Sequence, residues 1–371
     1  MTNRETLQSL EDAFEQLERL ARQRDVARQR DSAQASLQPS SPPVQQGNSS
    51  DLSYDQSNAP CLCGQNPLGI YVKNEGASSE FAVCPQCDPQ PRCEECQGTG
   101  QLRRFNLMLL RDEVFPGACP CRTGKRRAER LNQAALPKRY KTATFQSLTL
   151  DHLKQSEKSA RKLNDCRERV SEFCEAAVPF LDKQAQAPDK IFLTFLGPVG
   201  TGKTHLATAA LKWMVEETGC SARFVDFLYL LSQLRETYSQ NMSEESILKP
   251  LREADVLLID ELGKGRAEKA WQLEKLDDLL NSRYNEGRIT LLTTNYLPPE
   301  FSYDPARSGF RTAPSNESFW EQSLPERIGA RMYDRIVESS IFVDFIGLPS
   351  FRRALADDFI ERFKAERLKE F

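Results

Sequence analysis

The 371-residue sequence lacks several features that would assign it to common classes of protein. No apolar run approaches the roughly 18 residues that a membrane-spanning helix needs, so we expect no membrane span. The N-terminus has no apolar segment of the kind found in secretory signals. It also carries seven acidic residues before Ser32, which argues against a transit peptide. These absences predict a cytoplasmic protein.

The sequence also has little net charge, −3 over the whole chain, so it is not a polycation. Any contact with nucleic acid must therefore come from local patches. The strongest patch runs from Arg122 to Lys141, with eight Lys or Arg residues against one Glu. Phosphates are the natural counterion for such a run, although a solvated basic face is the alternative.

Cysteine, by contrast, is abundant, and eight of the eleven cysteines lie between 61 and 121. They form four close pairs: Cys61 and Cys63, Cys84 and Cys87, Cys93 and Cys96, and Cys119 and Cys121. In a reducing compartment, close pairs indicate metal ligands before disulfides. Two such pairs complete one tetrahedral site, so eight thiolates predict two structural Zn²⁺ ions. Sequential pairing of the pairs is favoured, a nested arrangement stays possible, and iron–sulfur is a rival whose usual spacings differ.

The N-terminal region divides into two unlike segments. Residues 3–30 repeat apolar side chains at a spacing of three to four, which predicts an amphipathic helix. In residues 32–60, twenty of 29 residues are Ser, Gln, Pro, Asn or Gly, which predicts a linker without a core. A helix isolated by such a linker has nothing of its own to pack on, so we expect residues 1–31 to dock on a partner protein; folding back onto this chain is the alternative.

The segment GPVGTGKT matches the phosphate-binding loop pattern, follows the apolar run 191–197 and opens a helical pattern. The predicted nucleotide-binding residues are Gly197, Pro198, Val199, Gly200, Thr201, Gly202, Lys203 and Thr204. Lys203 is expected to reach the β- and γ-phosphates of ATP, and Thr204 to hold Mg²⁺.

Two further apolar runs end in polar residues that suit phosphate chemistry. VLLID, residues 256–260, delivers Asp260 and Glu261 to one end of a strand. We expect Asp260 to order Mg²⁺ and Glu261 to polarise the attacking water. ITLLTTN, residues 289–295, ends in Asn295, whose amide can bind the γ-phosphate or the water. Buried runs alternating with helical patterns predict an α/β domain with a parallel sheet.

These motifs, with RIGARMYDRI and GLPSFR near the C-terminus, resemble the AAA+ ATPases of the bacterial helicase-loader family (DnaC and DnaI type) and the related transposition helper IstB. The resemblance spans about 137–353. It implies that Arg331 is an arginine finger serving a neighbouring subunit, with Arg335 as the alternative, and that Arg352 is the second sensor arginine. Arg327, Arg331 and Arg335 are four residues apart, so we expect them on one helix face. The proline-rich stretch 297–325 is an insertion relative to the family pattern.

The same resemblance implies a single-stranded DNA element between the two nucleotide motifs. The corresponding segment offers Phe227, Tyr229, Arg235 and Tyr238, which suit base stacking and phosphate contact, with helix core as the alternative for Phe227 and Tyr229. His205 is expected only to pack or cap behind the phosphate loop. The cysteine segment CEECQGTG resembles one zinc-binding repeat of DnaJ-type chaperones, which supports zinc and not chaperone activity.

The sequence therefore predicts an ATP-dependent helicase loader in DNA replication that binds single-stranded DNA, oligomerises, and meets the replicative helicase through residues 1–31. An IstB-like transposition helper and a zinc adaptor with an ATP-controlled switch are the alternatives. The expected organisation is a partner-binding helix (1–31), a linker (32–60), a double zinc module (61–124), a basic connector (125–137) and an AAA+ ATPase domain (138–371).

Overall fold

The computed structural model describes residues 61–64, 66–76, 78–106, 111–116, 118–149, 157–239, 243–265, 270–296 and 323–353. All of them belong to the second of two compact units, Gln56–Phe371. The expected helix 3–30, the linker 32–60, most of the insertion 297–325 and the residues after 353 lie outside the described residues.

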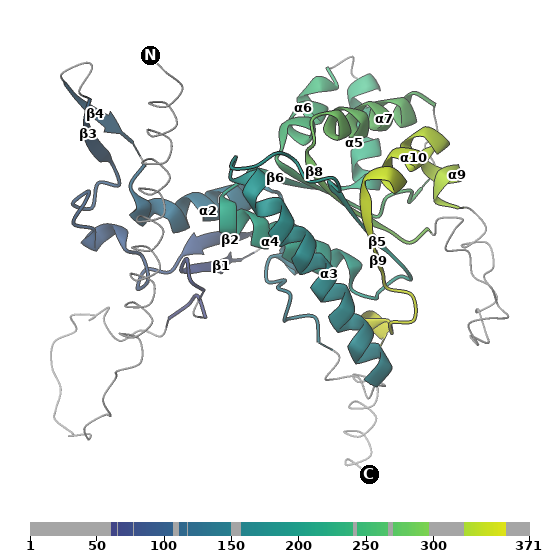
Figure 1. Cartoon of the computed structure of the whole chain (residues 1–371), viewed down its shortest axis with the longest axis horizontal. Helices are drawn as coiled ribbons and strands as arrows, with labels where there is room; N and C mark the ends of the chain where they lie inside the picture. The colour runs from purple at the N-terminus through teal and green to yellow at the C-terminus, as the bar shows by residue number, and fades with distance from the viewer. Residues whose placement is uncertain are drawn as a thin grey trace, which may run out of the picture. The chain divides into compact units, whose positions relative to one another are not determined.

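A five-stranded sheet with all-parallel pairing forms the centre of the nucleotide-binding part (Figure 1). In spatial order its strands are β6 (Ala222–Asp226), β7 (Val256–Asp260), β8 (Ile289–Thr294), β5 (Phe192–Leu196) and β9 (Ser340–Asp344). Every residue of β5, β7 and β8 is buried, which explains why these strands consist of apolar residues and threonine, with Asp260 at the end of β7. The predicted α/β fold with a parallel sheet is confirmed.

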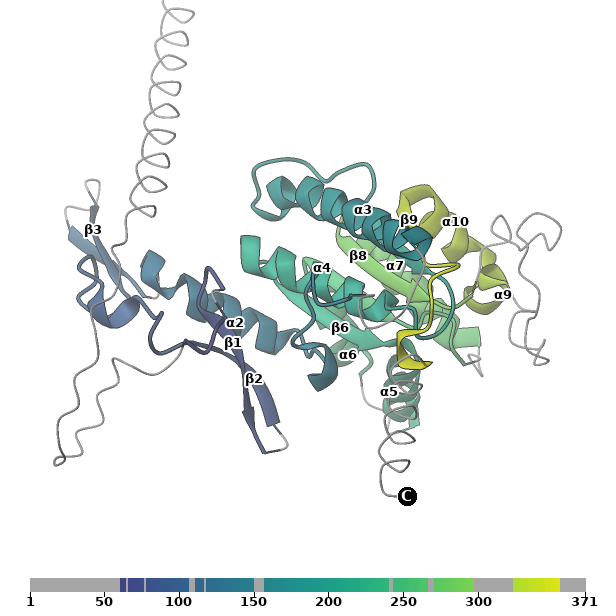
Figure 2. The same cartoon turned by 90° about the horizontal axis from the view of Figure 1, so that it is seen from below.

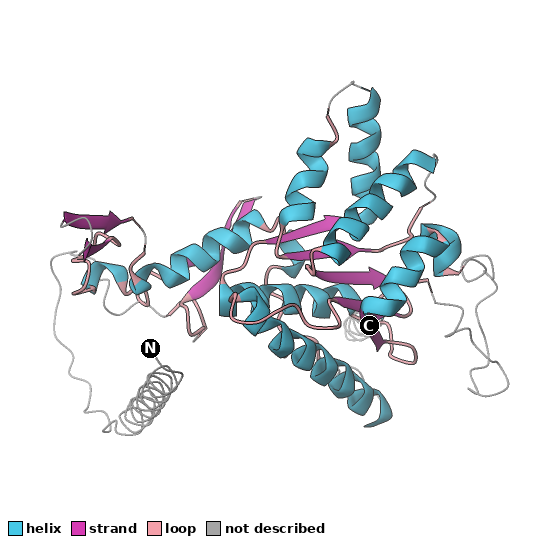
Figure 3. Cartoon of the chain, turned by 45° about the horizontal axis from the view of Figure 1, so that its top comes forward, coloured by secondary structure: helices cyan, strands magenta, loops and turns pink. Residues whose placement is uncertain are grey.

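Helices lie on both sides of this sheet (Figure 3). They are α3 (Glu157–Leu181), α4 (Lys203–Thr218), α5 (Phe227–Ser239), α6 (Glu245–Glu253), α7 (Ala270–Asn285), α9 (Leu324–Ile328) and α10 (Ala330–Ser339). Helix α4 contacts α3 and three strands, whereas α7 contacts α5, α6 and α10.

Arg283 in α7 is fully buried and forms hydrogen bonds to two other elements. Its guanidinium donates to the carbonyls of Leu251 (2.8 Å), Ala254 (2.7 Å) and Ile289 (2.6 Å), and to the hydroxyl of Thr290 (2.9 Å). These bonds connect α7 to the end of α6 and to the start of β8. Burial lowers the pKa of Arg283 to about 9, so the group is still charged at neutral pH.

The helix break near the C-terminus corrects one prediction. Gly329 has φ +89° and separates α9 from α10, so Arg327 does not share a helix face with Arg331 and Arg335. A side chain is disfavoured at this φ, which is why a glycine ends the first helix here.

The cysteine-rich part contains two antiparallel hairpins. Strands β1 (Ile70–Glu75) and β2 (Ser78–Val83) form the first, and β3 (Leu102–Asn106) and β4 (Arg111–Phe115) the second. Helix α2 (Thr123–Gln133) follows and contacts both β2 and α4 (Figure 2). The side chain of Asn132 in α2 bonds both backbone groups of Phe81 in β2, at 2.8 and 2.9 Å.

Phe81 also packs against the ATPase part. It is 3% exposed and belongs to the same hydrophobic core as Leu211 and Val215 of α4. The ammonium of Lys212 lies 5.6 Å from the centre of the Phe81 ring and donates to the carbonyls of Lys141 (2.6 Å) and Ala143 (2.8 Å). The first hairpin therefore packs on the helix that follows the phosphate loop.

Several basic side chains of residues 122–141 form contacts within the protein, which the sequence alone did not indicate. Lys125 pairs with Asp88 at 3.0 Å, and Arg127 donates to the carbonyl of Glu217 at 2.9 Å, where it caps the last turn of α4. Lys141 bonds the carbonyl of Ser79. Arg127 and Lys141, two of the basic residues expected to meet phosphates, thus join α2 and the first hairpin to the ATPase part.

Candidate nucleotide and metal sites

The phosphate loop runs from β5 into α4 and owes its shape to its glycines. Gly197, Gly200 and Gly202 have φ of +136°, +85° and +97°, a region that other residues rarely adopt. A Cβ at Gly202 would lie 2.7 Å from the side chain of Leu148, and one at Gly200 would lie 2.3 Å from the Ser350 hydroxyl. Both conformation and close packing therefore require glycine at these positions.

Lys203 begins α4 and is 6% exposed. Its ammonium donates to the carbonyls of Gly197 (2.8 Å) and Pro198 (2.7 Å), which places it within the loop. Burial lowers the pKa of Lys203 to about 8, and the nearby carboxylates of Asp260 and Glu261 oppose this shift. Phosphate oxygens entering the loop would restore a full positive charge on Lys203.

Thr204 and Asp260 meet at the end of the sheet. The Thr204 hydroxyl donates to Oδ1 of Asp260 at 2.7 Å, and the Thr293 hydroxyl donates to the same oxygen at 2.6 Å. Asp260 is buried, and burial raises its pKa against the effect of these two bonds. A hydroxyl beside a carboxylate is an oxygen donor set that suits Mg²⁺. Thr293 is a site residue that sequence reasoning missed, because only the pairing of β7 beside β8 shows its role.

Glu261 follows Asp260 in an unusual backbone conformation, with φ +57°. Its N–H donates to the Thr293 hydroxyl at 2.9 Å, and its side chain is 22% exposed and paired with Lys264. Residues other than glycine adopt this conformation infrequently, and such positions concentrate at functional sites. Glu261 therefore lies in the turn directly after β7, at the edge of the sheet where the phosphate loop also lies.

Asn295 comes directly after β8, at the carboxyl end of the parallel strands. This is the edge at which β5 enters the phosphate loop and β7 delivers Asp260. The next residue, Tyr296, is 5% exposed and lies under the guanidinium of Arg327, 4.6 Å from the ring centre. Arg327 also donates to the carbonyl of Gly265 at 3.2 Å.

The other arginines occupy different environments. Arg331 is exposed on α10, whereas Arg335 pairs with Asp277 of α7 at 2.7 Å. Arg352 is exposed and lies beside the phosphate loop, where the neighbouring Phe351 N–H donates to the Gly200 carbonyl at 2.9 Å. The structure thus brings Arg352 to the nucleotide site of its own chain and leaves Arg331 on the surface.

The eight clustered cysteines fall into two groups of four, and none of the eight is in a disulfide. One group is Cys61, Cys63, Cys84 and Cys87, and the other is Cys93, Cys96, Cys119 and Cys121. Within each group the sulfur atoms lie within 4.8 Å of one another, so either group could hold a metal ion. The grouping is sequential and not nested.

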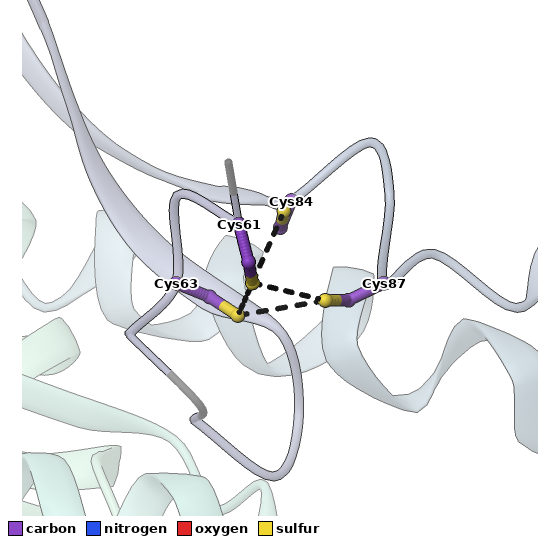
Figure 4. A group of neighbouring side chains, drawn as sticks. All are labelled: Cys61, Cys63, Cys84 and Cys87. Carbon is purple, nitrogen blue, oxygen red and sulfur yellow. Dashed lines mark hydrogen bonds between the residues drawn. The ribbon is translucent and has the colours of Figure 1, made fainter. Parts of the chain in front are cut away.

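Figure 4 shows the first group, whose side chains converge from the segment 61–64 and from the turn after β2. Cys61 Sγ lies 2.9 Å from that of Cys63, 3.3 Å from that of Cys87 and 3.9 Å from that of Cys84. In the second group, Cys96 Sγ also accepts the Gly100 N–H at 3.2 Å, a bond that supports a thiolate. Four converging thiols fit a tetrahedral zinc site filled entirely by cysteine.

The α5 segment separates into core and surface residues. Phe227 is 1% exposed, so of the two alternatives left open for it, base stacking and helix core, the structure supports helix core. Tyr229 is 59% exposed and Arg235 is exposed, whereas the side chain of Tyr238 lies outside the described residues. His205 bonds the Ser147 hydroxyl at 2.8 Å through Nε2, which agrees with the packing role expected for it.

The lowered pKa of Lys203 predicts a pH-dependent affinity for a nucleoside triphosphate. Binding requires the charged ammonium, so the affinity should be constant below a pH of about 8 and fall by about tenfold per pH unit above it. Calorimetry at pH 8 in two buffers of different ionisation enthalpy should detect proton uptake. Lys203→Arg keeps its charge and should flatten the profile; an affinity of the wild type that is constant from pH 7 to 9.5 would contradict the assignment.

Comparison with known proteins places these features in a family. Residues 118–301 match the family model described as IstB-like ATP binding protein. The replicative helicase loader DnaC of Buchnera aphidicola subsp. Schizaphis graminum is 26% identical over 167 residues, 44% of this chain and 60% of that protein. DnaC of Escherichia coli K12 is 28% identical over 128 residues, 33% of this chain and 51% of DnaC.

The phage-like element PBSX protein XkdC of Bacillus subtilis is 34% identical over 107 residues, 28% of this chain and 39% of XkdC. The chain thus spans between about two fifths and three fifths of these relatives' lengths. A crystal structure of the DnaC helicase loader aligns at 26% identity over 56% of this chain and 99% of that chain, with a TM-score of 0.41.

The phosphate loop, the Asp260–Glu261 pair at the end of a parallel strand and the family match lead to one assignment. Residues 118–301 form an AAA+ ATPase domain of the DnaC and IstB type.

Proposed function

We propose that the protein is a helicase loader that binds and hydrolyses ATP with Mg²⁺ during DNA replication. The observation that carries this proposal is the contact between Thr204 and Asp260, which joins the phosphate loop to the strand that delivers Glu261. The relatives named replicative helicase loader DnaC support the biological role.

Each site residue receives a role in hydrolysis. Lys203 and the loop amides bind the β- and γ-phosphates, and Thr204 and Asp260 would hold Mg²⁺, which neutralises phosphate charge when bound. Glu261 takes a proton from the attacking water, and Asn295 orients that water or the γ-phosphate. Arg352 acts on the nucleotide of its own chain. Arg331, exposed on α10, reaches the nucleotide of a neighbouring copy in an oligomer.

We assign partner binding to parts of the chain other than the sheet edge that carries the phosphate loop, Asp260 and Asn295. The exposed Tyr229 and Arg235 of α5 contact single-stranded DNA by stacking and charge. Residues 1–31 bind the replicative helicase, and a pull-down with these residues as bait tests that assignment. Among the described residues, no helix is long and apolar enough to cross a membrane.

A transposition helper is the second candidate, because the matching family model is described as IstB-like. The DnaC relatives favour the loader. Co-purification with a transposase in place of a replicative helicase would favour the helper.

We further propose that each cysteine group holds one structural Zn²⁺. The cysteine-rich part is small, and zinc sites in peptides supply about 10–16 kcal/mol of folding free energy each. Cysteine fills all four positions, so the ion has no open site for catalysis.

Hydrolysis should depend on the Glu261 carboxylate. Glu261→Gln should slow ATP turnover by about 10²–10⁴-fold, because the amide cannot accept the proton, while ATP affinity stays near the wild-type value. A coupled phosphate-release assay and a fluorescent nucleotide titration measure the two quantities. Glu253→Gln, an exposed carboxylate paired with Lys249, is the matched control and should leave turnover unchanged. Full turnover in Glu261→Gln would remove this residue from its role.

Metal analysis should find close to two zinc ions per chain, one for each cysteine group. Cys84→Ser and Cys119→Ser should each lower the content to about one, because each removes a buried ligand from a different four-ligand site. Cys174→Ala, a buried cysteine of α3 outside both groups, should keep two. Iron in matching amount with visible charge-transfer absorbance would contradict the zinc assignment.

A further inference from the structure

Lys264 lies three residues after the proposed catalytic Glu261, and its ammonium pairs with Oε2 of that carboxylate. The pairing with Glu261 raises the pKa of Lys264, so the ammonium is charged at neutral pH. The side chains of Lys264 and Glu261 are 46% and 22% exposed. This ion pair therefore lies at the surface, and one of its members is Glu261, the carboxylate proposed to activate water.

The backbone beneath the pair is fixed on two sides. The Leu262 N–H donates to the Thr293 carbonyl at 2.7 Å, and the Thr294 hydroxyl donates to the Leu262 carbonyl at 2.9 Å. Gly263, with φ +83°, leaves so little room that a Cβ would lie 3.1 Å from Tyr296 and 3.2 Å from Arg327. Because these bonds and contacts hold the backbone, we expect a change in the ion pair to move the side chains of Lys264 and Glu261 and not the loop.

The pairing has a direct chemical consequence. A carboxylate oxygen that accepts a hydrogen bond from an ammonium is turned toward that partner, and the same lone pair cannot accept a proton from water. Glu261 held by Lys264 is therefore restrained from its role. Exposed ion pairs are weak, so a stronger counterion can replace Glu261 as the partner of Lys264.

The neighbouring surface indicates which counterion this is. A Cβ on Gly265 would lie 2.9 Å from Leu228, so the first turn of α5 lies against the loop that carries Lys264. Leu228 and Tyr229 on this turn are 44% and 59% exposed. An exposed aromatic ring on the turn that contacts the Lys264 loop, together with the exposed ammonium of that loop, suits a stacked base and its phosphate.

We propose that Lys264 is a positioning residue that restrains Glu261 until a phosphodiester of single-stranded nucleic acid takes its ammonium. The proposal rests on the function proposed above. Nucleic acid bound along α5 would draw Lys264 away, leaving Glu261 free to orient toward the attacking water.

The test compares Lys264→Met and Lys264→Arg with the wild type, with and without a single-stranded oligonucleotide. Without DNA, Lys264→Met should raise kcat for ATP by about two- to fivefold, the range that loss of one exposed ion pair permits, with KM unchanged. DNA should then give no further stimulation. The dependence of DNA affinity on salt should also flatten by about 0.7 in the log–log slope, the value for one lost phosphate contact.

Lys264→Arg keeps the charge and should resemble the wild type. Lys275→Met is the matched control, because Lys275 is similarly exposed and pairs with Glu244 at 3.2 Å, away from Glu261. Thermal melting confirms that each variant is folded, and Lys264→Gln serves as a second neutral variant.

A basal rate in Lys264→Met at or below that of the wild type would overturn the proposal. So would a wild-type rate that does not respond to bound DNA, or stimulation of Lys264→Met to the wild-type extent. Failure of the proposed function is distinguishable, because it would appear in the wild type itself as absent hydrolysis or absent DNA binding.

Discussion

Helix α4 is the element on which both halves of the described chain depend. Its first turn carries Lys203 and Thr204, which end the phosphate loop, and a later turn carries Lys212, whose ammonium lies over the ring of Phe81 in the cysteine-rich part. Arg127 caps its last turn from α2. One helix of 16 residues therefore begins in the phosphate loop and contacts the cysteine-rich part and α2 through residues 211–217.

This arrangement gives the first cysteine group a structural link to the helix that follows the phosphate loop. Cys63, Phe81, Lys212 and Glu216 line one cavity, so the first cysteine group lies beside α4. Small domains that bury little apolar surface fold with the help of metal ions or disulfides, and we infer that the proposed zinc ions have this role here. The cysteine-rich part presents Phe81 to the core, and the ammonium groups of Lys141 and Lys212 lie over that ring. We infer that the metal sites stabilise the surroundings of α4 as well as their own hairpins.

The sequence predicted the features that are local in the chain. The phosphate loop, the Asp260–Glu261 pair and the strands ending near 196, 260 and 294 are contiguous patterns, and the structure contains each strand. The roles of the individual site residues remain predictions that the proposed variants test. The grouping of the cysteines was open on spacing alone, and the fold brings them together sequentially.

What the sequence could not predict depends on contacts between distant segments. Arg127 bonds a carbonyl 90 residues away, which turned part of an apparent phosphate-binding patch into an internal contact. Thr293 reaches Asp260 only because β7 and β8 are neighbours in the sheet. Gly329 could have signalled a break between Arg327 and Arg331, but a regular spacing of four residues hid it.

The central claim is that the cysteine-rich part and α4 form one cooperative structure. Hydrogen exchange measured by mass spectrometry on metal-loaded and metal-stripped protein tests it most directly, with α7 (270–285) as the internal control. The account predicts that stripping the metal speeds exchange in residues 203–218 as well as in 61–124, while α7 is unaffected. Unchanged exchange in 203–218, with residues 61–124 exchanging freely, would contradict it.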